Sequence, residues 1–159
     1  MRAAMRFVVV LALAGVAACD STDTPDYDDL SGAWEGQMGG SGQGVTIEAT
    51  VKATITQKEE ELSAVWNLNG KTTFMGESED IDDTITLTGT VKEGRDPQVS
   101  LAFPKDEDDI CPDVDPPVFT GSHKSTGMTM ELKTDLPVLN DDDCSEVAKI
   151  TLTAMLKKN

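Results

Sequence analysis

The sequence predicts an all-β domain that folds as a single antiparallel up-and-down barrel of about eight to nine strands, with one disulfide. Apolar and polar side chains alternate in several segments, and most of the connections between these segments are short. Such alternation is typical of half-buried strands, because successive side chains point to opposite faces. We therefore expect one apolar face per strand, which must close into a barrel or pair as two sheets.

The alternation is clearest in residues 45–57, 84–92 and 150–156, where threonine dominates much of the opposite face. Threonine is β-branched and polar, so it suits the solvated face of a strand. The apolar faces comprise Val45, Ile47, Ala49, Val51, Ala53 and Ile55, then Ile85, Leu87, Gly89 and Val91, and finally Ile150, Leu152, Ala154 and Leu156.

Weaker alternation predicts further strands at residues 30–38, 62–68, 99–103 and 128–132, and others near Phe74 and Phe119. The Asn69-Gly70 dipeptide predicts a two-residue hairpin turn. The glycine-rich run 39–44 predicts a hairpin loop, and "KSTG" at 124–127 predicts another turn. Residues 104–117 and 134–146 contain proline and many acidic residues, which predicts two long loops.

The first twenty residues differ from the rest of the chain. Arg2 and Arg6 precede twelve uncharged residues, 7–18, which are too few to span a membrane as a helix. A basic start, a short apolar run and small residues at its end are typical of a secretory signal peptide. The alternative is a buried core helix.

The end of this run, Val16-Ala17-Ala18-Cys19, resembles the bacterial lipobox. The resemblance implies cleavage before Cys19, lipidation of its thiol, and a membrane-anchored lipoprotein of the cell envelope that faces the periplasm or the exterior. More than one acyl chain gives stable anchoring. Asp20 leaves the choice of membrane open. The expected organisation is a signal peptide at 1–18, a lipidated cysteine and flexible acidic tether at 19–29, and the barrel domain at 30–159.

Once Cys19 is assigned to the anchor, Cys111 and Cys144 remain. In an oxidising compartment we expect them to pair. The bridge would close a loop of roughly 34 residues and contribute about 3–4 kcal/mol. The alternative is a metal-binding or catalytic thiol, but the chain has no CxxC motif and a single histidine.

The sequence carries a net charge of −16, with 29 acidic and 13 basic residues. Loss of residues 1–18 removes two arginines and leaves −18. This charge argues against binding to nucleic acid, which requires lysine and arginine, and against adsorption to anionic lipid. It favours a basic partner or a cation, although the alternative is simply an acidic, soluble surface.

The segment "SGAWEG" resembles the Gly-x-Trp start of lipocalin-like barrels, with Gly32 and Trp34 as the matching residues. The helix that packs beside a lipocalin barrel is missing from the sequence. The lipobox, acidic tether and threonine-rich strands together resemble small, uncharacterised β-barrel lipoproteins of bacterial envelopes.

A ligand pocket inside the barrel is one candidate site. An eight-stranded barrel either holds one small ligand or fills with side chains. A small apolar ligand would contact the large residues of the inward face, and the alternative is a packed core. These residues are Trp34, Trp66, Phe74, Phe103 and Met130.

A calcium site in the two acidic loops is the second candidate, because the disulfide would bring their carboxylates together. The spaced Asp-x-Asp-x-Asp-Gly loop is absent, and the alternative is a solvated acidic rim. No other cofactor is expected. The candidate ligands are Asp106, Asp108, Asp109, Asp113, Asp115, Asp141, Asp142 and Asp143.

Catalysis is not expected. His123 is the only histidine, and no Gly-x-Ser-x-Gly motif is present. The glycine-rich run 39–44 lacks the Lys-Ser/Thr of a phosphate-binding loop.

We therefore expect a lipid-anchored binding or structural module. One alternative is that the two acidic loops joined by the disulfide bind calcium or a protein, for example a basic enzyme that they would inhibit. The other is carriage of a small apolar ligand.

Overall fold

The computed structural model describes residues 28–92, 98–105, 111, 114–124, 128–139 and 144–159. Cys19, most of the predicted tether and most of the predicted calcium ligands lie outside the described residues. No helix in the described part is long and apolar enough to cross a membrane.

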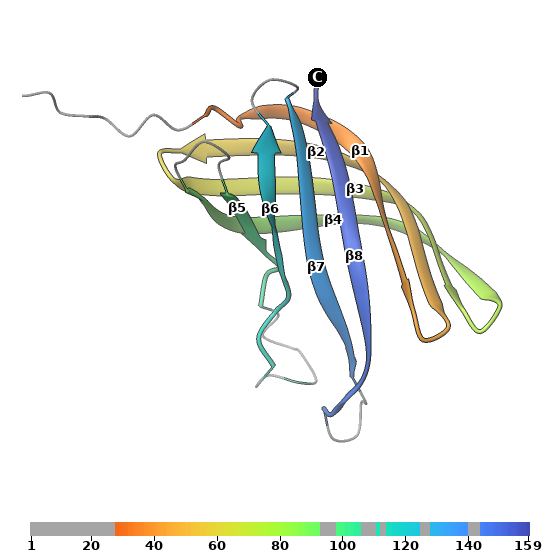
Figure 1. Ribbon diagram of the computed structural model, residues 1–159. Coiled ribbons are helices and arrows are strands. Elements are labelled where there is room, and N and C mark those ends of the chain that lie inside the picture. Colours follow the sequence, from red (N-terminus) through yellow and green to blue (C-terminus); the bar gives the residue numbers. More distant parts are fainter. Residues whose placement is uncertain (1–27, 93–97, 106–110, 112–113, 125–127, 140–143) are drawn as a thin grey trace, which may run out of the picture.

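Eight strands form one closed, antiparallel up-and-down barrel, which confirms the predicted fold class (Figure 1). Each strand pairs with the next one in sequence, and β1 pairs with β8 to close the barrel. The strands are β1 (Gly32–Gly42), β2 (Val45–Lys58), β3 (Glu61–Phe74), β4 (Glu77–Lys92), β5 (Gln98–Ala102), β6 (Val118–Lys124), β7 (Thr129–Leu139) and β8 (Glu146–Lys158).

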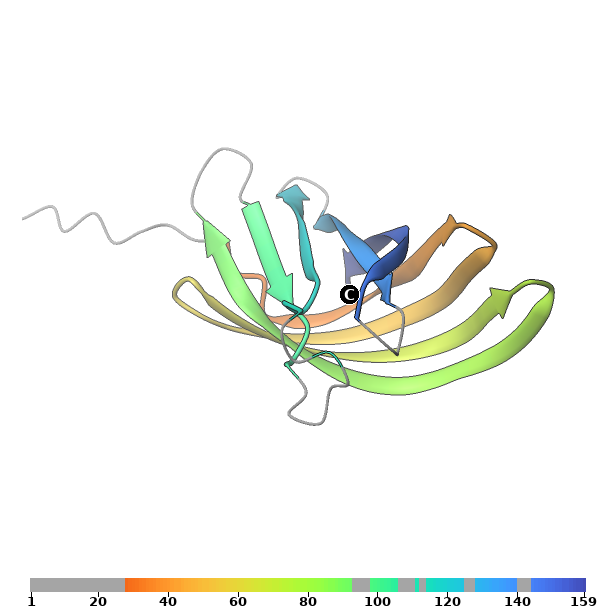
Figure 2. The ribbon, with the colours of Figure 1, turned by 90° about the horizontal axis from the view of Figure 1, so that it is seen from below.

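The barrel has two unequal halves. Strands β1–β4 are long and curved, and β5–β8 run across them on their concave side (Figures 1 and 2). Strands β5 and β6 are short, and β5 pairs only with Thr88–Lys92 of β4. The β3–β4 hairpin therefore projects beyond the closed part of the barrel (Figure 1). We call residues 68–83, at the end of this hairpin, the acidic hairpin.

The predicted alternation builds the core. In the middle of β2, Ala49, Val51, Ala53 and Ile55 are buried and the threonines and lysine between them are exposed. The same alternation buries Leu62, Ala64 and Trp66 of β3 and the inward residues of β8. Trp66 packs on Phe119, with 5.2 Å between ring centroids, and Phe119 stacks on Phe103. These three rings pack together in the core.

The predicted turn at Asn69-Gly70 is wrong. Strand β3 continues through both residues, which pair with Asp82 and Ile81 of β4. A side chain at position 70 would put its Cβ 2.0 Å from the carbonyl oxygen of Glu48, so this glycine allows β2 and β3 to approach closely. Because no turn interrupts β3 at these residues, the segment 61–74 is one strand and not two, and the barrel has eight strands.

The β3–β4 turn is instead Met75-Gly76. Both residues have positive φ, 48° and 91°, as a type I′ turn requires. The β1–β2 turn is Gln43-Gly44, with φ of 47° and 84°. The loop predicted at 39–44 is therefore too long, since Gly39–Gly42 belong to β1.

The loop predicted at 134–146 is also too long. Strand β7 extends to Leu139, and Pro137 pairs with Lys149 of β8. The pairing between β6 and β7 ends at Lys133 of β7. Beyond that residue, β8 is the one described strand that pairs with β7. A proline is tolerated there because its missing N–H can face the unpaired side.

Candidate binding surfaces

The structure places four of the five predicted pocket residues in or beside the core. Trp34, Trp66 and Met130 are at most 2% exposed, and Phe103 is partly buried against them. Phe74 is different. It shares the inward parity of β3 but lies at the tip of the projecting hairpin, where it is 53% exposed. Its inward placement is the wrong part of this prediction, because β5–β8 do not cover that end of β3.

One end of the barrel is covered by the segment that leads into β1. Leu30 is fully buried, and its carbonyl accepts a 2.8 Å hydrogen bond from Nε1 of Trp34. The backbone N–H of Leu30 donates to Gln57, and Nζ of Lys158 donates to the carbonyl of Asp29. These bonds fix residues 29–30 against strands β1, β2 and β8, so the last residues of the predicted tether are part of the folded domain.

His123 lies beneath this segment. Its ring packs edge-on against Trp34, with 5.7 Å between centroids, and is 4% exposed. The Asp28 carboxylate is 3.5 Å from Nδ1, and Nδ1 has no hydrogen-bond partner among the described residues. Burial lowers the pKa of His123 below its ordinary value, and the Asp28 carboxylate opposes that shift. The histidine is therefore a core residue in a site whose burial favours the neutral ring.

Cys111 and Cys144 form the predicted disulfide, which joins the β5–β6 connection to the β7–β8 connection. Of the eight predicted calcium ligands, the structure describes only Asp115, which is exposed. Among the described residues, no group of three or more histidine, cysteine, aspartate or glutamate side chains is placed to hold a metal ion. The calcium site remains a prediction about residues outside the described part.

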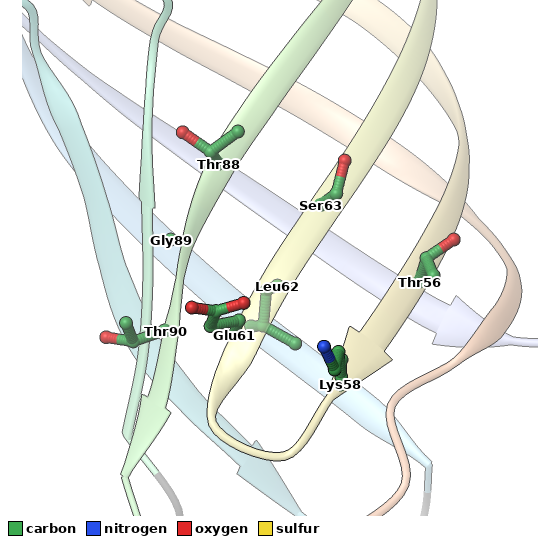
Figure 3. A pocket seen from close by; sticks show the side chains of 8 residues that line it. All are labelled: Thr56, Lys58, Glu61, Leu62, Ser63, Thr88, Gly89 and Thr90. Atoms are coloured by element: carbon green, nitrogen blue, oxygen red, sulfur yellow. The ribbon is translucent and has the colours of Figure 1, made fainter.

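Hollows on the described outer surface include one of about 260 Å³ that spans β5, β6 and β7, and two larger ones. One, of about 550 Å³, spans β2, β3 and β4, and four of its eight lining residues are threonine or serine, with Lys58 and Glu61 at one end (Figure 3). The other, of about 470 Å³, crosses β6, β7, β8 and β1 around the exposed side chain of Met155. Its rim carries both signs of charge, namely Glu35, Glu131, Lys124 and Lys157.

The acidic hairpin is a surface that sequence reasoning missed. Strand β4 begins with "ESEDIDD", residues 77–83, and all five of its carboxylate side chains are exposed. The cation that pairs with them in the described structure is Lys71, 3.9 Å from Asp80. At the tip, Phe74 and Met75 are 53% and 80% exposed. An apolar tip therefore stands beside a concentration of negative charge.

One signal in the sequence could have identified this hairpin. Ile81 has the same parity as Ile85, Leu87 and Val91, so the alternation of β4 continues back into the acidic run. Ile81 packs against the core as that parity requires.

Comparison of the chain with protein-family models, with curated proteins and with solved structures found no match.

Proposed function

We propose that this protein is a lipid-anchored module of the bacterial cell envelope that binds a positively charged partner protein through the acidic hairpin. The observation that carries the proposal is the hairpin itself, which projects from the barrel with five exposed carboxylates and an apolar tip. Complementary charge steers a basic partner toward such a surface. The exposed apolar side chains at the tip would become buried on binding and would supply affinity.

The core geometry supports binding at the surface more than carriage inside the barrel. The large inward residues contact one another, as the Trp66–Phe119 and Phe103–Phe119 ring pairs show. Large inward side chains that contact one another occupy space that a ligand would otherwise need. We therefore propose binding at the surface, and we expect no catalysis.

The anchor is proposed from the Val16–Cys19 motif, and a single substitution tests it. Cys19→Ser removes the thiol that would carry the lipid, so we expect the variant to leave the membrane fraction. Cys111→Ser is the matched control and should stay with the membrane. Full membrane retention of Cys19→Ser would contradict the anchor.

Photo-crosslinking in the native envelope tests the binding function. A crosslinker at Met75 of the full-length protein should capture a basic protein. Neutralising Glu79, Asp80 and Asp82 to their amides should lower the captured amount about tenfold, which corresponds to 1.4 kcal/mol. The control neutralises Glu59 and Glu60 of the β2–β3 turn and Glu61 at the start of β3, which changes the net charge equally at the opposite end of β3.

Equal loss of capture in both triple variants would contradict a role for the hairpin. Capture of an acidic protein, unchanged by either set of substitutions, would contradict the proposed function.

A further inference from the structure

Strand β4 has an open edge. Residues 77–87 pair with β3 on one side, and pairing with β5 begins only at Thr88. Among the described residues, no strand lies on the other side of this stretch. An open edge presents a row of backbone N–H and C=O groups that a further strand can use.

The hydrogen bonds show which residues present these groups. The N–H of Val91 donates to the Glu60 carbonyl, on the β3 side. In an antiparallel ladder the direction alternates, so odd-numbered residues of β4 face β3 and even-numbered ones face away. Thr84 agrees with this, because its N–H donates to the neighbouring Asp83 carboxylate at 2.7 Å instead of to β3. Ser78, Asp80, Asp82, Thr84 and Thr86 therefore present their backbone to the open edge.

The side chains beside the edge define the partner's chemistry. Asp80 and Asp82 are exposed on the outer face of the sheet. On the concave face, half-buried Ile81 and Ile85 alternate with exposed Glu79 and Asp83. A strand placed beside β4 would set its own side chains opposite these residues on the same faces. It would therefore carry lysine or arginine on the outer face, and both apolar and basic residues on the concave face.

Charge also argues against a second copy of this chain as the occupant. Pairing of two β4 edges would bring two acidic runs side by side, and like charges directly opposite each other destabilise a strand pair.

We propose that an extended, basic segment of a partner protein, with apolar residues opposite Ile81 and Ile85, adds to the open edge of β4 as a ninth strand. This rests on the proposed function and specifies how the acidic hairpin engages its partner. Residues 78–86 offer a pairing length of about 30 Å at roughly 3.3 Å per residue. Backbone hydrogen bonds hold the segment, and Asp80 and Asp82 select its basic residues.

The probe is a synthetic nine-residue peptide of alternating lysine and valine, added to the full-length protein in detergent. The matched control is the same peptide with every amide N-methylated, which keeps its charge and removes its hydrogen-bond donors. Binding of the unmodified peptide should be about tenfold tighter, or 1.4 kcal/mol, since charge alone would not separate the two. Equal binding would overturn strand addition while leaving electrostatic binding, and with it the proposed function, intact.

Amide hydrogen exchange supplies a residue-level readout. The bound peptide should slow exchange at Ser78, Asp80 and Asp82, whose N–H groups face the edge. Exchange at Ile81, which already bonds to β3, should change much less. Uniform slowing of exchange at all β4 amides would contradict the proposal. Slower exchange at the edge amides as protein concentration rises, without peptide, would also contradict it, because it would mean that a second copy of the chain occupies the edge.

Two substitutions at one position separate charge from backbone. Asp82→Asn and Asp82→Pro both remove the carboxylate, but only proline also removes the N–H at the edge. We expect Asp82→Pro to bind the peptide several-fold more weakly than Asp82→Asn, with melting temperatures showing that both are folded. Equal affinities in two folded variants would overturn the proposal. If the proline variant fails to fold, the methylated peptide decides the question.

Discussion

Trp34 and Trp66 are both buried, but their indole N–H groups are in different situations. That of Trp34 donates to the Leu30 carbonyl, whereas that of Trp66 has no hydrogen-bond partner among the described residues. We expect Trp34→Phe to lower the free energy of unfolding by about 1–3 kcal/mol more than Trp66→Phe, because it leaves a buried carbonyl unsatisfied. Urea denaturation of the two variants measures the difference. Equal losses, or a greater loss for Trp66→Phe, would contradict the assignment.

His123 makes stability depend on pH. Its pKa is lowered in the folded barrel, mainly by burial, so the unfolded chain binds a proton more readily. The stabilisation is fully present above the ordinary pKa of about 6.5 and is lost as pH falls through the lower folded value. We expect His123→Phe to flatten the decline in melting temperature below pH 6.5. An unchanged profile would contradict this role of His123.

At the level of the strand, close approach explains why glycine occurs inside β1. A Cβ at Gly36 would lie 1.8 Å from the Met155 carbonyl oxygen of β8, whereas one at Gly39 would lie 3.4 Å from its nearest neighbour, the Ile47 carbonyl oxygen. Gly36→Ala must therefore push two strands apart, and we expect a loss above about 2 kcal/mol. Gly39→Ala should change stability by less than about 1 kcal/mol. Thermal unfolding compares them, and equal losses would contradict the close approach at Gly36.

The strands were predictable where alternation was strong and unpredictable where the neighbouring strand decides the structure. The segment 45–57 has the predicted face because each inward residue is apolar. Asn69-Gly70 was predicted as a turn from local preference, yet β2 and β4 hold it in the ladder. Glu77–Asp83 was not predicted as a strand, since aspartate and glutamate are rare in strands. Pairing with β3 overrides that preference.

The candidate sites follow the same division. The disulfide was predictable because only two cysteines remained to pair. The acidic hairpin was not, because it depends on β5 and β6 being short enough to leave β4 uncovered. Sequence alternation does not report how long the neighbouring strand is.

For the whole molecule, the disulfide joins two connections that are far apart in the chain, with a sequence separation of 33. Cys111→Ser with Cys144→Ser should lower the free energy of unfolding by about 3–4 kcal/mol, because the unfolded chain regains the entropy of that loop. Denaturation with and without a reducing agent checks this. The reducing agent should lower the stability of wild type to that of the double variant and leave the variant unchanged. If the reducing agent lowers the stability of the double variant, the effect must come from Cys19, the one cysteine left in that variant.

The closure of the barrel by β1 and β8 has a consequence for the rate of folding. Paired residues such as Trp34 and Lys158 are separated by about 110–124 residues of chain, so this pairing carries the largest loop-closure entropy in the barrel. We expect it to form last, after the β2–β3–β4 hairpins, whose partners are close in sequence. Trp34 lies at the late contact and Trp66 in the early hairpins. In stopped-flow refolding, the Trp66→Phe variant, which keeps Trp34, should therefore show a slower fluorescence change than the Trp34→Phe variant. Identical rates would mean that the whole barrel closes in one step.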